Sequence, residues 1–336
     1  MLHLLARTRR PLAVAAAASA AAAAVGTTTA CAQIEDDVTY AKLALLGKGA
    51  KRLRRVASLS ASSEEVVENW SGTHSASPKY YFTPTDSAGV QSILDVLHEV
   101  GARLRIVGSA LSPNGLGLSD EAMMNVVGLD SILHVDKATA QVRVQAGARV
   151  SDVVEALRPH KLTLQNYASI AEQQIGGFMQ VGAHGTGAAI PPVDEQVVAF
   201  KLHTPGLGEL NISEEKCPKL FHLAKVSFGW LGVVSEVTLQ CVPAHKLLQH
   251  TFVETREGVA RRHAELLAHQ HVRYMWIPHT DTVVVVTCDP IAEGAEPPPP
   301  PSRAEKYTRE PEPRTTMLPV PVPSVPSAPL KHLVCA

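Results

Sequence analysis

The hydrophobic positions between about residue 69 and residue 290 follow alternating helical and strand periods. The first helix is predicted by apolar residues at three- and four-residue spacing, with Asp86 or Ser87 available as its cap: Val90, Ile93, Leu94, Leu97 and Val100. A second amphipathic helix is predicted in VSDVVEALRPH (150–160), where Pro159 ends it, and a third in PKLFHLAK (218–225), with Pro218 in its first turn.

Strands are predicted where apolar residues alternate with polar ones or form short runs. RLRIV (103–107) reads as a strand that leads directly into the loop GSALSPNGLGLS. The segments ILHVD and QVRVQAG flank KATA as a hairpin, and VVAFKLHT (197–204) and VVSEVTLQCV (233–242) are further strands. The fold class predicted from this mixture is α+β.

Two loops rich in glycine are the strongest chemical signal in the chain, at residues 108–112 and 176–187. Consecutive amides at such turns can point at one spot and bind an anion, usually a phosphate. The chain has no Walker A motif and no GxGxxG fingerprint. It also lacks the GxSxG elbow that an esterase would need beside the sequence HGTG. The structural alternative is that these glycines only make tight turns around a buried His184.

Composition narrows the classes of function. Of 336 residues, 45% are hydrophobic and 19% charged, as in a globular protein with a substantial core. A formal net charge of −1 and only 4% aromatic residues give no reason to expect a nucleic-acid partner. The cysteines show no CxxC spacing, so we expect no metal site.

The two ends of the chain differ from its middle. Residues 1–36 carry arginines, many alanines and no acid before Glu35, which predicts an organelle-targeting presequence, with a secretory signal as the alternative. Residues 37–68 are interpreted as a linker or membrane-proximal segment. Residues 291–336 are rich in proline and are interpreted as a disordered or aberrant tail.

Several longer segments carry a family resemblance. ENWSGTH (68–74), VGSALSPNGLGLS (107–119), VQAGARV (144–150) and the stretch from Leu162 to Val197 resemble the galactonolactone dehydrogenases of plants and algae. These enzymes belong to the vanillyl-alcohol-oxidase flavoproteins. The resemblance implies a two-lobed FAD-binding domain of the p-cresol-methylhydroxylase type at 69–245 and the start of a C-terminal cap domain at 246–290. Family-like sequence fades near residues 306–308, so we expect the rest of the cap domain to be missing.

The resemblance also implies which residues bind FAD. The family's first pyrophosphate loop matches Val107, Gly108, Ser109, Ala110, Leu111 and Ser112. Its second loop matches Ser169, Ile175, Gly176 and Gly177, and a turn near the cofactor matches Ala183, His184, Gly185 and Gly187. The backbone of a late strand that meets FAD matches Val233 and Val234. For His184, hydrogen bonds that fix the loop are favoured over a direct bond to the flavin or ribityl.

Two positions define the expected subtype. Many relatives have a flavin-linking histidine where this chain has Leu111, so the resemblance implies non-covalent FAD. Ala168 matches the residue that restricts the access of oxygen to the reduced flavin in dehydrogenases. The catalytic acid and base are expected in the missing C-terminal part and are unknown. Glu172 and Glu195 are interpreted as structural residues.

The implied activity is the oxidation of L-galactono-1,4-lactone to L-ascorbate, with cytochrome c as the electron acceptor. The resemblance further implies a mitochondrial location in association with the inner membrane. Two alternatives stay open. One is a sugar-1,4-lactone oxidase of the D-arabinono-1,4-lactone or gulonolactone type, and the other is a non-catalytic FAD-binding assembly factor that acts on respiratory complex I intermediates.

Overall fold

The computed structural model describes residues 61–62, 66–292 and 294–295. The chain divides into two units at the boundary between Glu293 and Gly294, and almost everything described lies in the first. The predicted presequence (1–36), most of the predicted linker (37–68) and most of the proline-rich tail (291–336) lie outside the described residues.

The first lobe is a four-stranded sheet covered by one long helix. Its strand order is β1-β4-β6-β5, with strands Ala61–Ser62, Tyr80–Phe82, Ala122–Asn125 and Leu104–Val107. Helix α4 (Ser87–Val100) has the predicted cap, because the Asp86 side chain accepts a hydrogen bond from the Gly89 amide at 2.7 Å. Its predicted apolar face packs on the sheet, and Leu97 and Phe82 are fully or almost fully buried there. The short pair β2 (Val67–Glu68) and β3 (Ser75–Ala76) lies between β1 and β4 in the chain.

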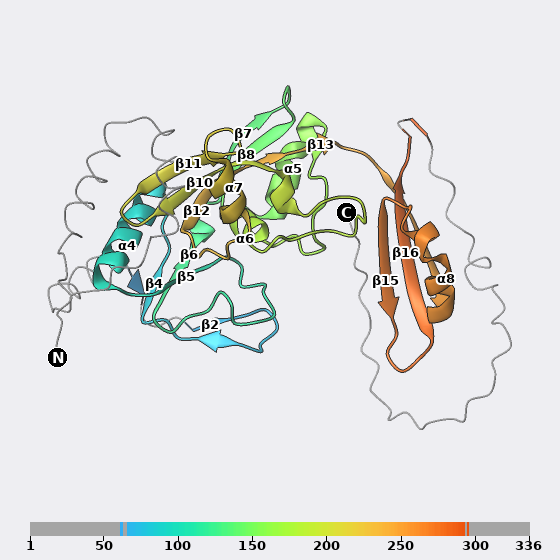
Figure 1. The fold of residues 1–336 in the computed structure, drawn as a ribbon, viewed down its shortest axis with the longest axis horizontal. Helices are drawn as coiled ribbons and strands as arrows, with labels where there is room; N and C mark the ends of the chain where they lie inside the picture. Colours follow the sequence, from blue (N-terminus) through green and yellow to red (C-terminus); the bar gives the residue numbers. More distant parts are fainter. Residues whose placement is uncertain (1–60, 63–65, 293, 296–336) are drawn as a thin grey trace, which may run out of the picture. The chain divides into compact units, whose positions relative to one another are not determined.

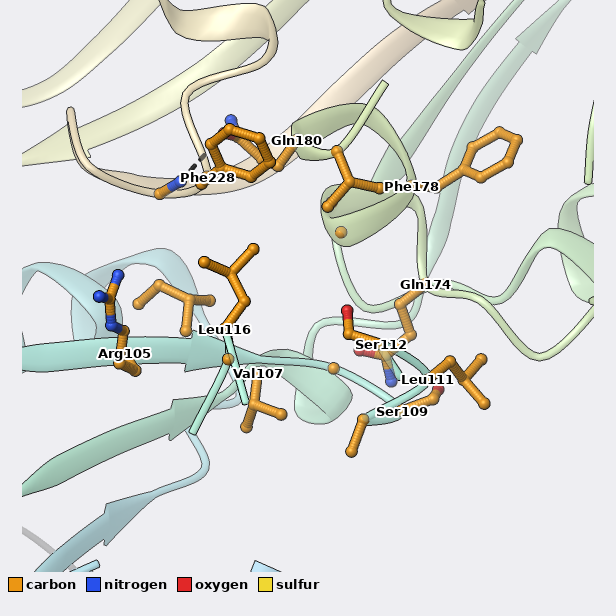
Figure 2. Close-up of a pocket in the computed structure, with 18 of the residues that line it drawn as sticks. Arg105, Val107, Ser109, Leu111, Ser112, Leu116, Gln174, Phe178, Gln180 and Phe228 are labelled. Atoms are coloured by element: carbon orange, nitrogen blue, oxygen red, sulfur yellow. Dashed lines mark hydrogen bonds between the residues drawn. The ribbon is translucent and has the colours of Figure 1, made fainter. Parts of the chain in front are cut away.

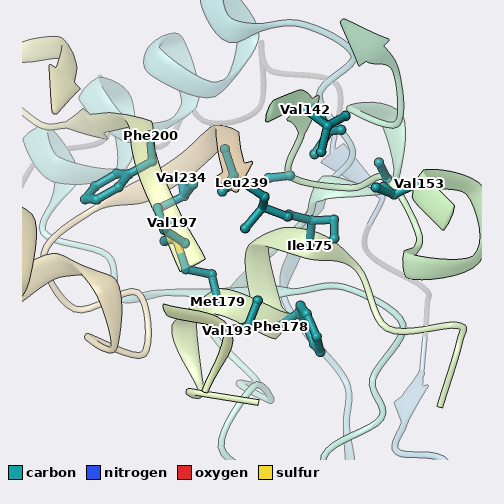
Figure 3. Close-up of a cluster of buried hydrophobic side chains, with 14 of the residues drawn as sticks. Val142, Val153, Ile175, Phe178, Met179, Val193, Val197, Phe200, Val234 and Leu239 are labelled. Carbon is teal, nitrogen blue, oxygen red and sulfur yellow. The ribbon is translucent and has the colours of Figure 1, made fainter. Parts of the chain in front are cut away.

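The second lobe is a five-stranded antiparallel sheet with helices on one face (Figure 1). The strand order is β11-β10-β12-β8-β7, with strands Gly208–Ser213, Val197–Thr204, Val233–Gln240, Gln141–Gln145 and Ile132–Asp136. The helices of this lobe are α5 (Val150–Leu157), α6 (Ile175–Gln180) and α7 (Pro218–Lys225). Their apolar faces and the inward side chains of the sheet form the largest core (Figure 3). The short turns and strands of this region are η1 (Val126–Gly128), η2 (Arg158–His160), η3 (Val193–Gln196), β9 (Leu162–Thr163) and β13 (Val242–Pro243).

A buried polar contact joins the two lobes where helix α4 meets strands β10 and β12. His203 on β10 is completely buried, and its Nε2 lies 2.8 Å from Ser235 Oγ on β12. Its Nδ1 lies 3.2 Å from Gln91 Oε1 on α4, and Gln91 Nε2 donates to Thr204 O at 3.1 Å. Because α4 packs on its own sheet and on β10 and β12, the lobes share a fixed boundary.

A third sheet follows in the chain. Its order is β14-β16-β15, with strands Leu247–Thr255, Thr282–Pro290 and His271–Trp276, and helix α8 (Arg256–Leu266) packs on it. These elements fall inside the segment 246–290 that the sequence assigns to the start of a cap domain, and that domain boundary stays a prediction.

Most of the elements predicted from hydrophobic periodicity are present. Several elements were not predicted from periodicity, among them α6 within the second glycine-rich segment and the elements of the third sheet. Two further details also differ from the predictions. Helix α5 ends at Leu157, and Pro159 lies in the following 3-10 turn instead of closing the α-helix itself. Strand β11 was not predicted, although Leu210 and Ile212 alternate with polar residues and are buried.

Candidate functional site

A cavity of about 420 Å³ lies between the two lobes (Figure 2). One wall is the end of β5 and the loop that follows it, residues 107–118, and the other is formed by α6 and residues 228–234. Figure 2 shows Arg105, Leu116 and Ser112 on the first wall, opposite Gln180 and Phe228 on the second.

The first glycine-rich segment meets the residues just before the second one at this cavity. Ser109 Oγ in the first loop (residues 108–112) donates a hydrogen bond to Glu172 O at 2.7 Å, just before α6. A Cβ atom on Gly108 would stand 2.6 Å from Gln174 Oε1, so the Gln174 side chain would have to move to make room for it. The segments are 63 residues apart in sequence, and the fold brings them into contact.

The first loop has amides available for a ligand. Among the described residues, the N–H groups of Ser109 to Ser112 donate to no protein acceptor. Ala110 has φ of 51°, a conformation that costs a non-glycine residue on the order of 1 kcal/mol. Free amides at a turn with a left-handed residue are the arrangement that binds anions.

The second loop, here residues 175–177, leaves fewer amides available for a ligand than the first loop does. The amides of Ile175 and Gly176 donate to Ala148 O and Ala146 O, at 2.9 and 2.7 Å. Gly176 is required by packing, since its Cβ would stand 2.8 Å from that of Ala146. Only Gly177 has open space, with nothing within 4 Å of a Cβ atom. Its backbone therefore lies exposed at the cavity wall.

The far wall depends on a residue that the sequence analysis missed. Gln180 Oε1 accepts hydrogen bonds from Ser227 N, Ser227 Oγ and Gly229 N at 3.2, 3.0 and 3.1 Å. These bonds hold the turn in which Phe228 and Gly229 have φ of 54° and 74°. Gly229 was the only sequence signal for this turn, because a glutamine in a helix marks no motif.

The cavity lining is largely apolar, with a few polar side chains and little charge. Arg105 is the only charged residue among the described residues that line it, and its guanidinium lies 5.6 Å from the centre of the Trp230 ring. Gln173 Oε1 and Gln174 Oε1 are buried without a hydrogen-bond partner in the described part of the chain. Buried acceptors without a partner are costly, and a bound polar ligand with donors would satisfy them.

Only some of the residues predicted to bind FAD line this cavity. Val107 to Ser112, Gly176, Gly177 and Val234 line the cavity. The remaining predicted residues do not: Ser169, Ile175, Ala183, His184, Gly185, Gly187, Val233 and the proposed oxygen gate Ala168. Ile175 and Val233 are core residues, Ala168 packs against the larger core, and Ser169 is exposed.

The His184 turn (residues 183–187) has its own packing. His184 is exposed, so the alternative of a buried histidine is wrong, and its Nδ1 lies 2.9 Å from Gly185 O. A Cβ on Gly185 would stand 2.2 Å from Asn166 Oδ1 and 2.7 Å from Tyr167 O, and one on Gly187 would stand 2.7 Å from Ile190 Cδ1. Contacts with protein atoms, without any ligand, explain the glycines of this turn.

The side chains that line the cavity offer no group for a covalent link. Leu111 lines the cavity, and no histidine, cysteine or tyrosine is found among the described lining residues. Nucleophilic side chains of those types are needed for such a bond. Glu195 forms an ion pair with the buried Lys225 at 3.4 Å, in keeping with a structural role. Across the described segments, no group of His, Cys, Asp and Glu residues could hold a metal ion.

Comparison with known proteins identifies the domain. Residues 78–211 match the family model described as an FAD binding domain. This part of the chain belongs to that FAD-binding family. The match includes the whole first loop and the segment from Glu172 to Gly177, whereas Asn69 and the lining residues at 228–234 lie outside it.

Curated relatives extend the match beyond this domain. The chain is 52% identical over 246 residues to the mitochondrial L-galactono-1,4-lactone dehydrogenase of Arabidopsis thaliana, covering 73% of this chain and 40% of that protein. It is 33% identical over 223 residues to the L-gulonolactone oxidase of Bos taurus, covering 66% of this chain and 51% of that one. The chain thus spans about 40% of the length of its L-galactono-1,4-lactone dehydrogenase relatives.

A solved structure confirms the fold. An alkyldihydroxyacetonephosphate synthase superposes with a TM-score of 0.62 at 12% identity, over 73% of this chain and 56% of that one. The predicted α+β fold with a two-lobed FAD-binding domain is confirmed. FAD as its cofactor is confirmed by the family model and the dehydrogenase relatives. The residues that bind FAD, and its non-covalent attachment, stay predictions.

Proposed function

We propose that this domain holds FAD non-covalently in an oxidoreductase that converts L-galactono-1,4-lactone to L-ascorbate. The observation that carries the proposal is the meeting of the first loop and residues 172–177 at one cavity, with the amides of Ser109 to Ser112 unpaired in the described chain. The substrate class is supported by the 52% identity to an L-galactono-1,4-lactone dehydrogenase.

The residues present fit the diphosphate of FAD. Backbone amides at close range recognise phosphate oxygens, and each charged hydrogen bond contributes about 1.5–3 kcal/mol. Gly177 leaves the opposite wall open for a close approach, and Arg105 supplies a positive charge at the same cavity. We propose that Val107 to Ser112, Gly176, Gly177 and Val234 contact the cofactor, and that Ser109 also ties the two loops together.

FAD, when bound, would accept the hydride from the carbinol beside the lactone carbonyl. This chain's own contribution is to bind and orient the cofactor between its lobes. No described residue of the cavity is positioned as an acid or base, because its lining contains no carboxylate and no histidine. The catalytic acid and base therefore belong to other parts of such an enzyme.

The electron acceptor separates the two enzyme candidates. We propose cytochrome c as the acceptor, since identity to the dehydrogenase (52%) exceeds identity to the gulonolactone oxidase (33%). Ala168 is proposed to slow the reaction with oxygen through the packing of the core around it. Replacing Ala168 by glycine should then speed peroxide formation by the reduced flavoprotein and leave FAD binding unchanged.

The proposed location is the mitochondrion, because several relatives are named as mitochondrial proteins. Association with the inner membrane is a further proposal. None of the described helices has both the length and the apolar character to cross a bilayer. Respiratory complex I intermediates are a further proposed partner, which comigration of the chain with such intermediates on native gels would test.

The decisive experiment uses the full chain loaded with FAD. Acid precipitation should release all of the flavin into the supernatant, since no lining side chain can bond to it. Anaerobic L-galactono-1,4-lactone should bleach the flavin of an enzyme that contains this domain, and cytochrome c should restore the colour faster than oxygen does. Flavin that stays with the precipitate, or a chain that binds no FAD, would contradict the proposal.

A further inference from the structure

A short segment between β2 and β3, residues 69–74, holds the first loop. Asn69 is only 4% exposed, and its side-chain amide has two separate tasks. Its Oδ1 accepts hydrogen bonds from the amides of Thr73 and His74 at 3.0 and 3.1 Å, which closes the turn at residues 69–74. Its Nδ2 donates to Thr73 Oγ1 at 3.2 Å and to Ser112 O at 3.0 Å, which reaches the first loop.

The same turn binds two more carbonyls of that loop region. Trp70 N donates to Ala110 O at 3.0 Å, and Thr73 Oγ1 donates to Pro113 O at 3.1 Å. Together with the bond from Asn69, residues 69–73 bind the carbonyls of residues 110, 112 and 113. We name residues 69–73 the clamp. Its bonds lie on both sides of Leu111 and hold Ala110 in its left-handed conformation.

Because the peptide bond is planar, the bonds to these carbonyls also fix the direction of the N–H groups that follow them. In a trans peptide, the N–H of one residue points opposite to the C=O of the residue before it. No cis peptide bond occurs among the described residues, so the N–H groups of Leu111 and Asn114 point away from the clamp. Neither donates to an acceptor within the described chain, and both residues line the cavity.

We propose that the clamp is a positioning device that aims the amides of Leu111 and Asn114 at the diphosphate of the cofactor. Trp70 N and Thr73 Oγ1 set those two amides through Ala110 O and Pro113 O. Asn69 closes the turn that carries both donors and holds Ser112 O, which is followed by Pro113 and so aims no amide itself. This inference rests on the proposed function, which places FAD in this cavity. Asparagine suits the position because its short side chain carries an acceptor oxygen and an NH₂ group with two donors. Asn69-Trp70-Ser71 also has the form of a glycosylation acceptor, but the burial of Asn69 leaves no room for a sugar.

Two variants of the full chain test the role of the clamp. Asn69→Asp keeps the acceptor that closes the turn and removes the donor to Ser112 O. Thr73→Val removes the hydroxyl that binds Pro113 O and introduces no charge, so it controls for repulsion between a new carboxylate and the diphosphate. Asn211→Asp is the matched control, because Asn211 is exposed on β11 and lines no part of this cavity.

Affinities for FAD and for riboflavin, measured by quenching of flavin fluorescence, separate positioning from folding. Riboflavin has the same ring system and no phosphate, so a structural defect would weaken both ligands alike. For Asn69→Asp we expect the Kd for FAD to rise by roughly 10-fold to 100-fold, the loss of one or two charge-assisted hydrogen bonds, with the Kd for riboflavin little changed. Thr73→Val should raise the Kd for FAD by about 5-fold, and Asn211→Asp should change neither.

The outcomes distinguish failure of the positioning role from failure of the proposed FAD site. Equal losses for FAD and riboflavin in both clamp variants, or an unchanged Kd for FAD, would overturn the positioning role while the proposed function stands. A wild-type chain that binds riboflavin as tightly as FAD would instead overturn the diphosphate site itself. Should Asn69→Asp not fold, Thr73→Val carries the same test on its own.

Discussion

The first loop and the His184 turn look alike in sequence and differ in structure. Both are short and rich in glycine, and both were predicted to bind the same cofactor. The first loop lines the cavity between the lobes and leaves its amides unpaired within the described chain. In the His184 turn, Gly185 and Gly187 are packed against Asn166 and Ile190, and no residue of the turn lines that cavity.

The difference shows that a cluster of glycines has two physical origins. A glycine can be required because protein atoms stand where a Cβ would be, as at Gly185. It can also keep open a space that only a ligand would fill, as at Gly177. The first kind supports stability and the second supports binding, so substitutions should separate the two.

The largest effect on stability is expected for Gly185→Ala. A methyl group there would meet Tyr167 O at 2.7 Å, and backbone atoms cannot move aside cheaply. We expect the free energy of unfolding to fall by about 3 kcal/mol, with unchanged FAD affinity in the protein that remains folded. Chemical denaturation with and without FAD measures both quantities. An unchanged denaturation midpoint would show that the turn is looser than its contacts indicate.

Gly177→Ala should behave in the opposite way. No protein atom lies within 4 Å of the new methyl group, and alanine is the better helix former by up to about 1 kcal/mol, so the ligand-free protein should be as stable or slightly more stable. The methyl group would enter the cavity, and we expect the Kd for FAD to rise by about 10-fold, or about 1.4 kcal/mol. Titration calorimetry tests this, and tighter binding of FAD would refute the assignment of Gly177 to the cofactor.

A smaller effect is expected where the first loop touches the residues just before the second glycine-rich segment. Ser109→Ala removes the hydrogen bond to Glu172 O and should cost about 1 kcal/mol of stability. Because the bond holds the cavity walls together, FAD affinity should fall as well, by about 5-fold. A loss of stability without any loss of affinity would mean that the walls are held by other contacts.

The smallest effect concerns the boundary between the lobes. Burial lowers the pKa of His203 below its usual 6.5, which outweighs the opposing influence of the Glu209 carboxylate. The folded protein therefore keeps His203 neutral, while the unfolded chain takes up a proton near pH 6.5. Stability should be full above about pH 6.5 and fall below it, by at most about 1.4 kcal/mol per pH unit from this residue.

His203→Gln should remove that part of the pH dependence of stability and leave the affinity of the protein for FAD unaltered. Thermal unfolding between about pH 7 and pH 5 measures the slope. An identical slope in the variant would show that His203 does not titrate in this range.

The sequence predicted the elements whose burial repeats with a clear period. Helix α4 followed from Val90, Leu94 and Leu97, and the hairpin of β7 and β8 from the alternation at Val142 and Val144. Helix α8 has no such pattern, since only Gly258 and Leu266 in it are buried. Local periodicity could not indicate it for that reason.

The site was predictable only in part. The first loop was found because its motif is contiguous. Gln180 and Phe228 reach the same cavity from distant segments, and Phe228 has a positive φ that local preferences disfavour. The clamp depends on bonds to carbonyls 40 to 43 residues away, and such contacts leave no mark on local sequence.

A crystal structure of the full chain with bound FAD tests the central claim most directly. Diphosphate oxygens should lie within about 3.2 Å of amide nitrogens in the segment Ser109 to Ser112, with Gly177 facing them across the cavity. A diphosphate bound elsewhere, with those amides turned toward solvent or protein, would contradict the account.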